Sequence, residues 1–210
     1  MTRLLNIGGA VIGIVALVLQ FSITVPASLE AGRSLVGSIV YFFSFFTILT
    51  NILVVLVHVS ALTGRPVVMR RPSWRAGTGV AIAVVGIVYH VLLADLWQPE
   101  GLFYVCDMLL HYVTPALYVV WWLMMAEGSL GWRHLFWWLV WPVGYSAYAL
   151  ARAPIAGEVP YPFLDMAVIG LPRVLIAIGA IALLFIAVGI VFLAYDYFVG
   201  RRRRRAVVNA

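Results

Sequence analysis

Charged residues are scarce in this sequence, and lysine is absent. Of the 210 residues only 10% are charged, whereas 64% are hydrophobic, and the mean hydropathy is +1.05. Soluble domains usually carry about one quarter charged and about half apolar residues. The composition therefore excludes a water-soluble globular protein and predicts an integral membrane protein, whose functional groups must lie within a helical bundle.

Cysteine is nearly absent too, and the positive charge is confined to a few places. The single Cys106 excludes an intrachain disulfide. All 14 basic residues are arginine, and five of them form the run 201–205, so the net charge of +6 is a local feature. It does not predict nucleic-acid binding. We interpret the run as a topological stop signal that also contacts anionic lipid headgroups.

The hydrophobic runs predict an all-α, polytopic bundle of six transmembrane helices in a single domain. Each run is long enough to cross a hydrocarbon core of about 30 Å, and residues that break helices or carry charge separate the runs. The predicted spans are residues 4–25, 35–62, 76–94, 102–126, 134–151 and 166–195, followed by a basic tail at 196–210. A signal peptide cleaved after Ala27 is the alternative interpretation of the first run.

The arginines also predict the orientation of the bundle. With six spans, the two termini and the second and fourth loops lie on one side, which collects 11 of the 14 arginines. Short arginine-rich loops stay in the cytoplasm, so both termini are predicted to be cytoplasmic. Because the arginine-only, alanine-rich composition is typical of a bacterium with a GC-rich genome, the expected location is the bacterial plasma membrane.

Polar side chains inside two of the spans follow the helical period. At 100° per residue they form one stripe on each helix, and a polar group in hydrocarbon is costly unless it faces protein or water. We therefore expect the stripes to meet inside the bundle. The stripes are Ser44, Thr47, Asn51 and His58 in the second span, and Asp107, His111, Thr114 and Tyr118 in the fourth.

Thr47 and His111 can lie at the same depth, roughly 18 Å and 14 Å along their helices from one surface. A hydroxyl, an imidazole and the carboxylate of Asp107, one turn before His111, are the groups of a nucleophile, a general base and an orienting residue. The alternative is packing alone: Thr47 would bond to its own helix, and Asn51 would hydrogen-bond to His111.

The other polar residues of the spans leave alternatives open. His90 lies near the outer end of the third span, where it joins the site from above or simply meets the interface. Tyr145 belongs to an aromatic face of the fifth span, which either lines a pocket or packs. His58 is too far along its helix to share the site with Thr47. Because His58, His90 and His111 lie at different depths, we predict neither a metal site nor a haem.

Three short motifs resemble those of a known family. They are Phe46 to Asn51 in the second span, Leu110-His111 followed by Pro115 in the fourth, and Tyr161 to Asp165 before the sixth. The chain resembles the androgen-induced protein family of six-helix membrane proteins, which includes the androgen-dependent TFPI-regulating proteins and a bacterial branch. The resemblance covers nearly the whole chain. In the third motif Asp165 is expected to cap the helix that follows.

The resemblance implies an intramembrane threonine hydrolase, because animal members cleave esters between fatty acids and hydroxy fatty acids. Carried over, the nucleophile is Thr47 and the base is His111. We expect Asp107 to orient the imidazole and Asn51, one turn after Thr47, to donate to the oxyanion. The sequence departs from the family beside His111, where Tyr112 and Val113 replace small hydroxyl residues.

The sequence therefore predicts a hydrolase of lipid esters with catalytic residues Thr47 and His111, and no cofactor. Its partners would be membrane lipids and a hydrophobic acyl substrate. The alternative is a non-catalytic membrane protein that binds or transports a lipid or small amphiphile. Ser44 and Thr50 compete with Thr47 as the attacking hydroxyl. The remaining candidates for the pocket wall are His90, Thr114, Tyr118 and Tyr145.

Overall fold

The computed structural model describes residues 2–208, with side chains described for residues 2–202. All regular elements of this part of the chain are helical, which confirms the predicted all-α class. The α-helices are α1 (Thr2–Glu30), α2 (Leu35–Phe42), α3 (Phe46–Thr63), α4 (Pro72–Val88), α5 (Gly101–Met108), α6 (Thr114–Met125), α7 (Arg133–Ala156), α8 (Met166–Ile169) and α9 (Leu171–Val208). Two segments, Tyr89–Leu93 and Leu109–Val113, are π-helical.

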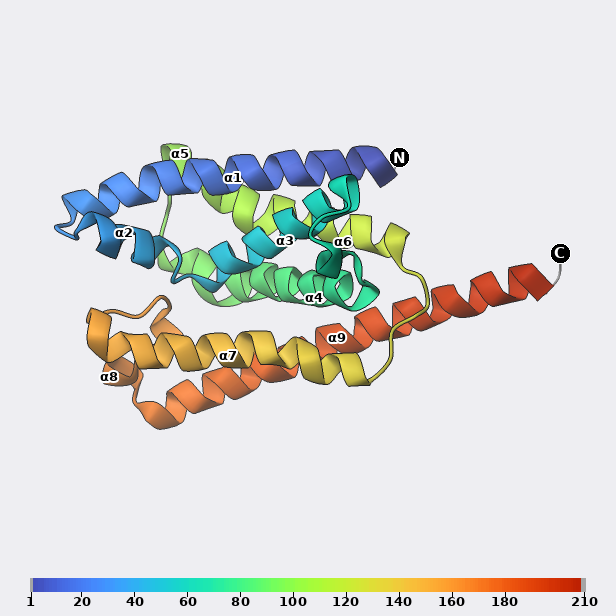
Figure 1. Cartoon of the computed structure of the whole chain (residues 1–210). Coiled ribbons are helices and arrows are strands. Elements are labelled where there is room, and N and C mark those ends of the chain that lie inside the picture. Colours follow the sequence, from blue (N-terminus) through green and yellow to red (C-terminus); the bar gives the residue numbers. More distant parts are fainter. Residues whose placement is uncertain (1, 209–210) are drawn as a thin grey trace.

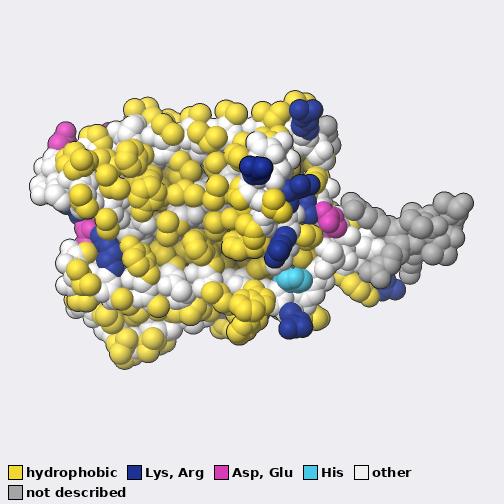
Figure 2. All heavy atoms as spheres, viewed as in Figure 1, with side chains coloured by type: hydrophobic (Ala, Val, Ile, Leu, Met, Phe, Trp, Pro, Cys, Tyr) yellow, Lys and Arg dark blue, Asp and Glu magenta, His cyan; other side chains and the backbone are white. Residues whose placement is uncertain are grey.

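The long helices lie side by side along one direction, and the start of α1 and the end of α9 lie toward the same end of the bundle (Figure 1). Within the described residues, five helical segments are long and apolar enough to cross a membrane. They are Thr2–Glu30, Phe46–Thr63, Pro72–Leu96, Gly101–Met125 and Leu171–Arg202. Charged side chains gather near the two ends of the bundle, and a broad hydrophobic surface separates them (Figure 2). The chain is a multi-pass membrane protein.

The fifth predicted span, 134–151, lies within α7, which is not among these five segments although it has 24 residues. Polar residues and prolines lower its hydropathy, and it packs against α9 and α4. The predicted span 166–195 begins with the short α8, where the side chain of Asp165 accepts hydrogen bonds from the backbone of Ala167 and Val168. This confirms the predicted cap. Gly170 ends α8, so the last helix, α9, begins only at Leu171, and the expected continuous helix from 166 is corrected. The side chains of Arg203 to Arg205, part of the predicted stop signal, lie outside the described residues.

The second predicted span is not one helix, which corrects the expected continuous run 35–62. α2 ends at Phe42 and α3 begins at Phe46, so the chain breaks inside the bundle. A break in the membrane leaves backbone groups that need partners. The carbonyl oxygen of Ser44 accepts a hydrogen bond from the Tyr145 hydroxyl at 2.9 Å, and the N–H of Thr47 donates to the Tyr161 hydroxyl at 3.2 Å.

The half of the bundle nearer the termini is densely packed. A Cβ on Gly9 of α1 would lie 2.4 Å from Nε2 of His58 on α3, and one on Gly13 would lie 2.7 Å from Val55. Two glycines one turn apart let α1 and α3 approach closely. His58 itself is 1% exposed, and its Nδ1 lies 2.7 Å from Oδ1 of Asn6.

The same end is closed by a buried carboxylate. Asp196 of α9 is 1% exposed and accepts hydrogen bonds from the backbone N–H groups of Glu127, Gly128 and Leu130 at 2.8–3.1 Å. Gly128 has a φ of +78°, and a Cβ there would lie 2.2 Å from Cα of Gly200. The loop between α6 and α7 is therefore fixed onto α9, and the open space of the bundle lies toward the other end.

Candidate functional site

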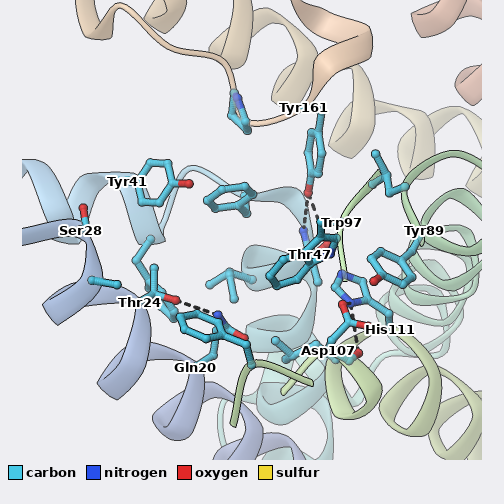
Figure 3. Close-up of a pocket in the computed structure, with 18 of the residues that line it drawn as sticks. Gln20, Thr24, Ser28, Tyr41, Thr47, Tyr89, Trp97, Asp107, His111 and Tyr161 are labelled. Carbon is cyan, nitrogen blue, oxygen red and sulfur yellow. Dashed lines mark hydrogen bonds and ion pairs between the residues drawn. The ribbon is translucent and has the colours of Figure 1, made fainter. Parts of the chain in front are cut away.

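A cavity of about 490 Å³ opens in the half of the bundle away from the termini. Its walls come from α1, α2, the start of α3, the π-helical segments and the loop before α8. Figure 3 shows Gln20 and Thr24 of α1 on one side, and Thr47, Asp107 and His111 on the other. The predicted nucleophile, base and orienting carboxylate thus line one cavity.

Thr47 lies in the first turn of α3, directly after the break in the chain. The side chain is buried but lines the cavity, and its Oγ1 lies 3.3 Å from the hydroxyl of Tyr161. The first N–H groups of a helix have no partner within that helix, and the helix dipole places partial positive charge there. The break therefore brings Thr47 and a positively polarised helix end to the cavity wall together.

His111 lies in the π-helical segment Leu109–Val113, with its side chain 15% exposed. Its Nδ1 is 3.1 Å from the carbonyl oxygen of Asp107, in the better aligned contact, and 3.1 Å from the carboxylate Oδ1 of the same residue. Both neighbours are acceptors, so we assign the ring proton to Nδ1. Nε2 then carries the free lone pair, which is the state that a general base needs.

The orientation of the His111 ring is also fixed from its face. The ring of Tyr89 stacks on it, with centroids 3.7 Å apart and planes 13° apart. Tyr89 is the first residue of the other π-helical segment, Tyr89–Leu93. Such segments are rare and often occur at functional sites. Here two of them, on neighbouring helices, hold the stacked pair against the cavity.

Asn51 joins the two walls that carry Thr47 and His111. Its Nδ2 donates to the carbonyl oxygen of Thr47 at 2.9 Å and to that of Leu110 at 3.3 Å. The two carbonyl oxygens therefore lie close to one nitrogen, which ties the start of α3 to the π-helical segment of His111. Because both amide hydrogens are used in this way and Asn51 is 0% exposed, the expected role as an oxyanion donor does not fit this geometry.

Thr47 lines the cavity, whereas the two other candidate nucleophiles, Ser44 and Thr50, do not. Ser44 is 0% exposed and donates to the carbonyl oxygen of Tyr41 at 2.6 Å, and Thr50 is 0% exposed and accepts from the indole of Trp141. Neither residue is among those that line the cavity. Of the three hydroxyl groups proposed from the sequence, only that of Thr47 is placed to meet a ligand there.

The remaining pocket candidates lie elsewhere. Tyr118 is 0% exposed and its hydroxyl donates to the carbonyl oxygen of Arg75, near the termini. Thr114 is buried behind the cavity wall, and His90 is exposed beside the hydroxyl of Tyr112. Tyr145 supports the chain break and lines a smaller cavity of about 50 Å³. None of the four is among the residues that line the main cavity.

Sequence reasoning missed three residues of the site. Tyr161 was noted only as part of a motif, although its hydroxyl contacts both the N–H and Oγ1 of Thr47. Tyr89, which stacks on His111, was missed because an aromatic residue in an apolar helix gives no polar signal. Arg33 was counted only for topology, but it lines the cavity. Arg33 could have been identified from the sequence, because a charged residue so close to the start of a predicted span is unusual.

The rim of the cavity carries an ion-pair cluster formed by Arg33, Arg152 and Glu158. The carboxylate of Glu158 pairs with Arg33 through one oxygen and with Arg152 through the other. Burial alone would raise the pKa of Glu158, but the hydrogen bonds and charges of the two arginines outweigh it and hold this pKa below its usual value of 4.5. Glu158 therefore stays ionised at neutral pH.

Comparisons with family models, with curated proteins and with solved structures give no match to this chain.

Proposed function

We propose that the protein is an intramembrane hydrolase of lipid esters, with Thr47 as the nucleophile and His111 as the general base. The observation that carries this proposal is the cavity wall itself. It carries the hydroxyl of Thr47 and an imidazole whose Nδ1 lies 3.1 Å from Asp107, which leaves Nε2 free to accept a proton. A hydroxyl, a base and a group that orients the base are the minimum that acyl transfer to a side chain requires.

In the proposed reaction Nε2 of His111 takes the hydroxyl proton of Thr47 as Oγ1 bonds to the ester carbonyl carbon. The tetrahedral intermediate collapses by breaking the bond to the alcohol oxygen, which takes the proton from Nε2 and leaves. Water then attacks the acyl-threonine, giving its proton to Nε2. Collapse of this second intermediate releases the fatty acid, and the proton returns to Oγ1 of Thr47.

Negative charge on the carbonyl oxygen needs donors that are already in position. The start of α3 supplies the positive end of a helix dipole at Thr47. The hydroxyl of Tyr161, 3.3 Å from Oγ1 of Thr47, is a donor that takes over the role first expected of Asn51. Asp107 stabilises the imidazolium that forms at His111.

The cavity walls fit an amphiphile. Apolar side chains such as Leu93, Leu96 and Phe103 line one part, while Gln20 and Thr24 offer polar groups across from Thr47. An acyl chain would occupy the apolar part, having entered sideways from the bilayer. We further propose that α7 also crosses the membrane, which gives six spans, that both termini face the cytoplasm of a bacterium, and that the chain belongs to the androgen-induced protein family.

A non-catalytic lipid-binding protein is the second candidate, and one observation favours it. Among the described side chains no hydrogen bond joins the hydroxyl of Thr47 to His111, because that hydroxyl is next to Tyr161 instead. Hydrogen bonds between catalytic groups are often loose without substrate, and labelling with an active-site probe distinguishes the two candidates.

The deciding experiment is labelling of the purified protein in detergent by a fluorophosphonate probe, which reacts with activated hydroxyl groups. We expect labelling of the wild type and its loss in Thr47→Ala and in His111→Ala. Thr47→Ser keeps the hydroxyl and should retain part of the labelling. Thr50→Ala is the matched control, because it removes a threonine hydroxyl on the same helix that does not line the cavity.

Each outcome has a clear meaning. Loss of labelling in the two site variants, with melting temperatures close to that of the wild type, supports the hydrolase. A wild type that does not label, but whose melting temperature rises with a fatty acid ester, favours the lipid-binding protein. Labelling that survives Thr47→Ala but not Thr50→Ala would move the nucleophile and contradict the assignment.

A further inference from the structure

The ion-pair cluster of Arg33, Arg152 and Glu158 has more positive than negative charge. Nη2 of Arg152 donates to Oε1 of Glu158 at 3.0 Å, and Arg33 donates to the other carboxylate oxygen. Two guanidinium groups thus share one carboxylate, which leaves a net charge of about +1. Glu158 cannot satisfy both arginines completely, because each guanidinium has five N–H donors.

Arg152 has a donor without a partner. Its side chain is only 11% exposed, and its Nη1 is a buried nitrogen that makes no hydrogen bond within the described part of the chain. Buried charged donors are costly unless they are paired and hydrogen-bonded. An acceptor that carries negative charge would therefore be stabilised beside Arg152.

An open hollow of about 600 Å³ lies beside this cluster, and Arg152 is among the residues that line it. Arg33, Ser34, Arg152 and Glu158 form its polar part. Ser34 is the N-cap of α2 and accepts a hydrogen bond from the N–H of Gly37, so it marks the positive end of the helix dipole. Two independent features, the arginine pair and this helix start, therefore favour an anion at one place.

The other part of the hollow is apolar and faces the surroundings. Val40 of α2 and Ile155 of α7 line it, and they are 44% and 88% exposed. Both lie on helices of the membrane bundle (Figure 1). A charged pole next to exposed apolar side chains matches a lipid, with an anionic headgroup at one end and acyl chains at the other.

We infer that an anionic lipid headgroup binds between Arg33 and Arg152, with its acyl chains along Val40 and Ile155. The headgroup chemistry is a phosphate diester or a carboxylate, either of which can accept hydrogen bonds from two guanidinium groups. This site is separate from the proposed ester hydrolysis and does not depend on it. Arg33 lines both the hollow and the Thr47 cavity, so the lipid would lie beside the cavity.

The test is native mass spectrometry of the full-length protein, titrated with phosphatidylglycerol, oleate or phosphatidylcholine. We expect both anionic lipids, or one of them, to bind more tightly than phosphatidylcholine. Arg152→Gln and Arg33→Gln should each weaken anionic-lipid binding about tenfold, the effect of losing one charge-assisted hydrogen bond. Glu158→Gln should strengthen it, because it removes the competing carboxylate; a misfolded variant would not show that gain.

Arg173→Gln is the matched control. Arg173 is exposed near the start of α9, toward the same end of the bundle as Arg152, so the variant removes an equal charge without touching the cluster. Binding should not change. Equal binding of all three lipids, or an equal loss in Arg173→Gln, would overturn the inference. Displacement of the lipid by millimolar inorganic phosphate would also overturn it, since the site would then hold a free ion. Turnover is not measured, so failure of the hydrolase proposal leaves this result intact.

Discussion

His58 and His111 are two histidines on polar stripes of neighbouring helices, in surroundings that differ in one respect. Each has Nδ1 fixed by a polar neighbour, Asn6 for His58 and Asp107 for His111. Nε2 of His58 faces Gly9, where even a Cβ would not fit. The ring of His111 instead lines a cavity.

The free volume beside the ring, rather than the polarity or hydrogen-bond partners of the residue, distinguishes a packing histidine such as His58 from a candidate base such as His111. Near the termini, Gly9 and Gly13 bring α1 against α3 and leave no room for a ligand. Toward the other end, the break between α2 and α3 and the π-helical segments interrupt regular packing, and a cavity remains.

Exchange of each histidine for glutamine should affect different properties. His111→Gln should lower turnover of a fatty acid ester by roughly 10²- to 10⁴-fold, the usual contribution of general acid–base catalysis, with a small change in melting temperature. His58→Gln should lower the melting temperature and change turnover little, because a different side chain must fit between Asn6, Tyr118 and Trp121. Turnover and thermal melting of both variants check this. Similar profiles at both positions would remove the distinction.

Gly9→Val tests the packed region alone. Its Cβ would lie within 2.4 Å of His58 Nε2, so α1 must move, at a cost of about 1–3 kcal/mol. Gly8→Val is the matched control, since nothing lies within 4 Å of a Cβ there. Denaturation in mixed detergent should show a loss for Gly9→Val only. Equal stability of the two variants would contradict the close contact between α1 and α3.

Helical phase placed Thr47 and His111 on polar stripes that were expected to meet, and both residues line the cavity. The choice of Thr47 and His111 within the stripes came from the family resemblance. The helical phase gave the wrong face for the residues that follow His111. The π-helical segment Leu109–Val113 has more residues per turn than an α-helix, so residues after it are rotated relative to the expected face. Tyr118 consequently points to the backbone of Arg75 instead of the cavity.

The break after Phe42 was not predictable from its own neighbourhood. Ser44 is the one residue between α2 and α3 with a polar side chain, and neither proline nor glycine marks the position. The groups that stabilise the break, the hydroxyls of Tyr145 and Tyr161, come from residues about 100 positions later in the chain. The membrane bundle could be predicted from the sequence, because hydropathy depends only on residues that are neighbours in the chain. The break could not, because the hydrogen bonds that stabilise it join residues far apart in the chain.

Tyr161→Phe tests the cavity end of the bundle at a residue whose role in the site was not predicted from the sequence. It removes the hydroxyl next to Thr47 and leaves the N–H of Thr47 without that partner, at a cost of about 1–3 kcal/mol. We expect turnover to fall roughly tenfold or more, with KM changed little. Tyr104→Phe, at a 53% exposed position, is the control. An unchanged kcat in Tyr161→Phe would leave Tyr161 a structural role only.

The smallest expected effect is the pH dependence of the stability that the ion-pair cluster at the rim of the cavity contributes. The pKa of Glu158 is lowered by Arg33 and Arg152 in the folded protein, so its ion pairs stabilise the fold fully above pH 4.5, its usual value. That contribution is lost as the pH falls through the lower folded value, when the carboxylate takes up a proton. Because the pairs are partly exposed, the loss should be about 1 kcal/mol or less. Melting temperatures between pH 6 and pH 3 should fall less steeply in Glu158→Gln than in the wild type. Parallel curves would mean that the cluster contributes nothing to folding, and the two arginines would then be held at the rim for their charge alone.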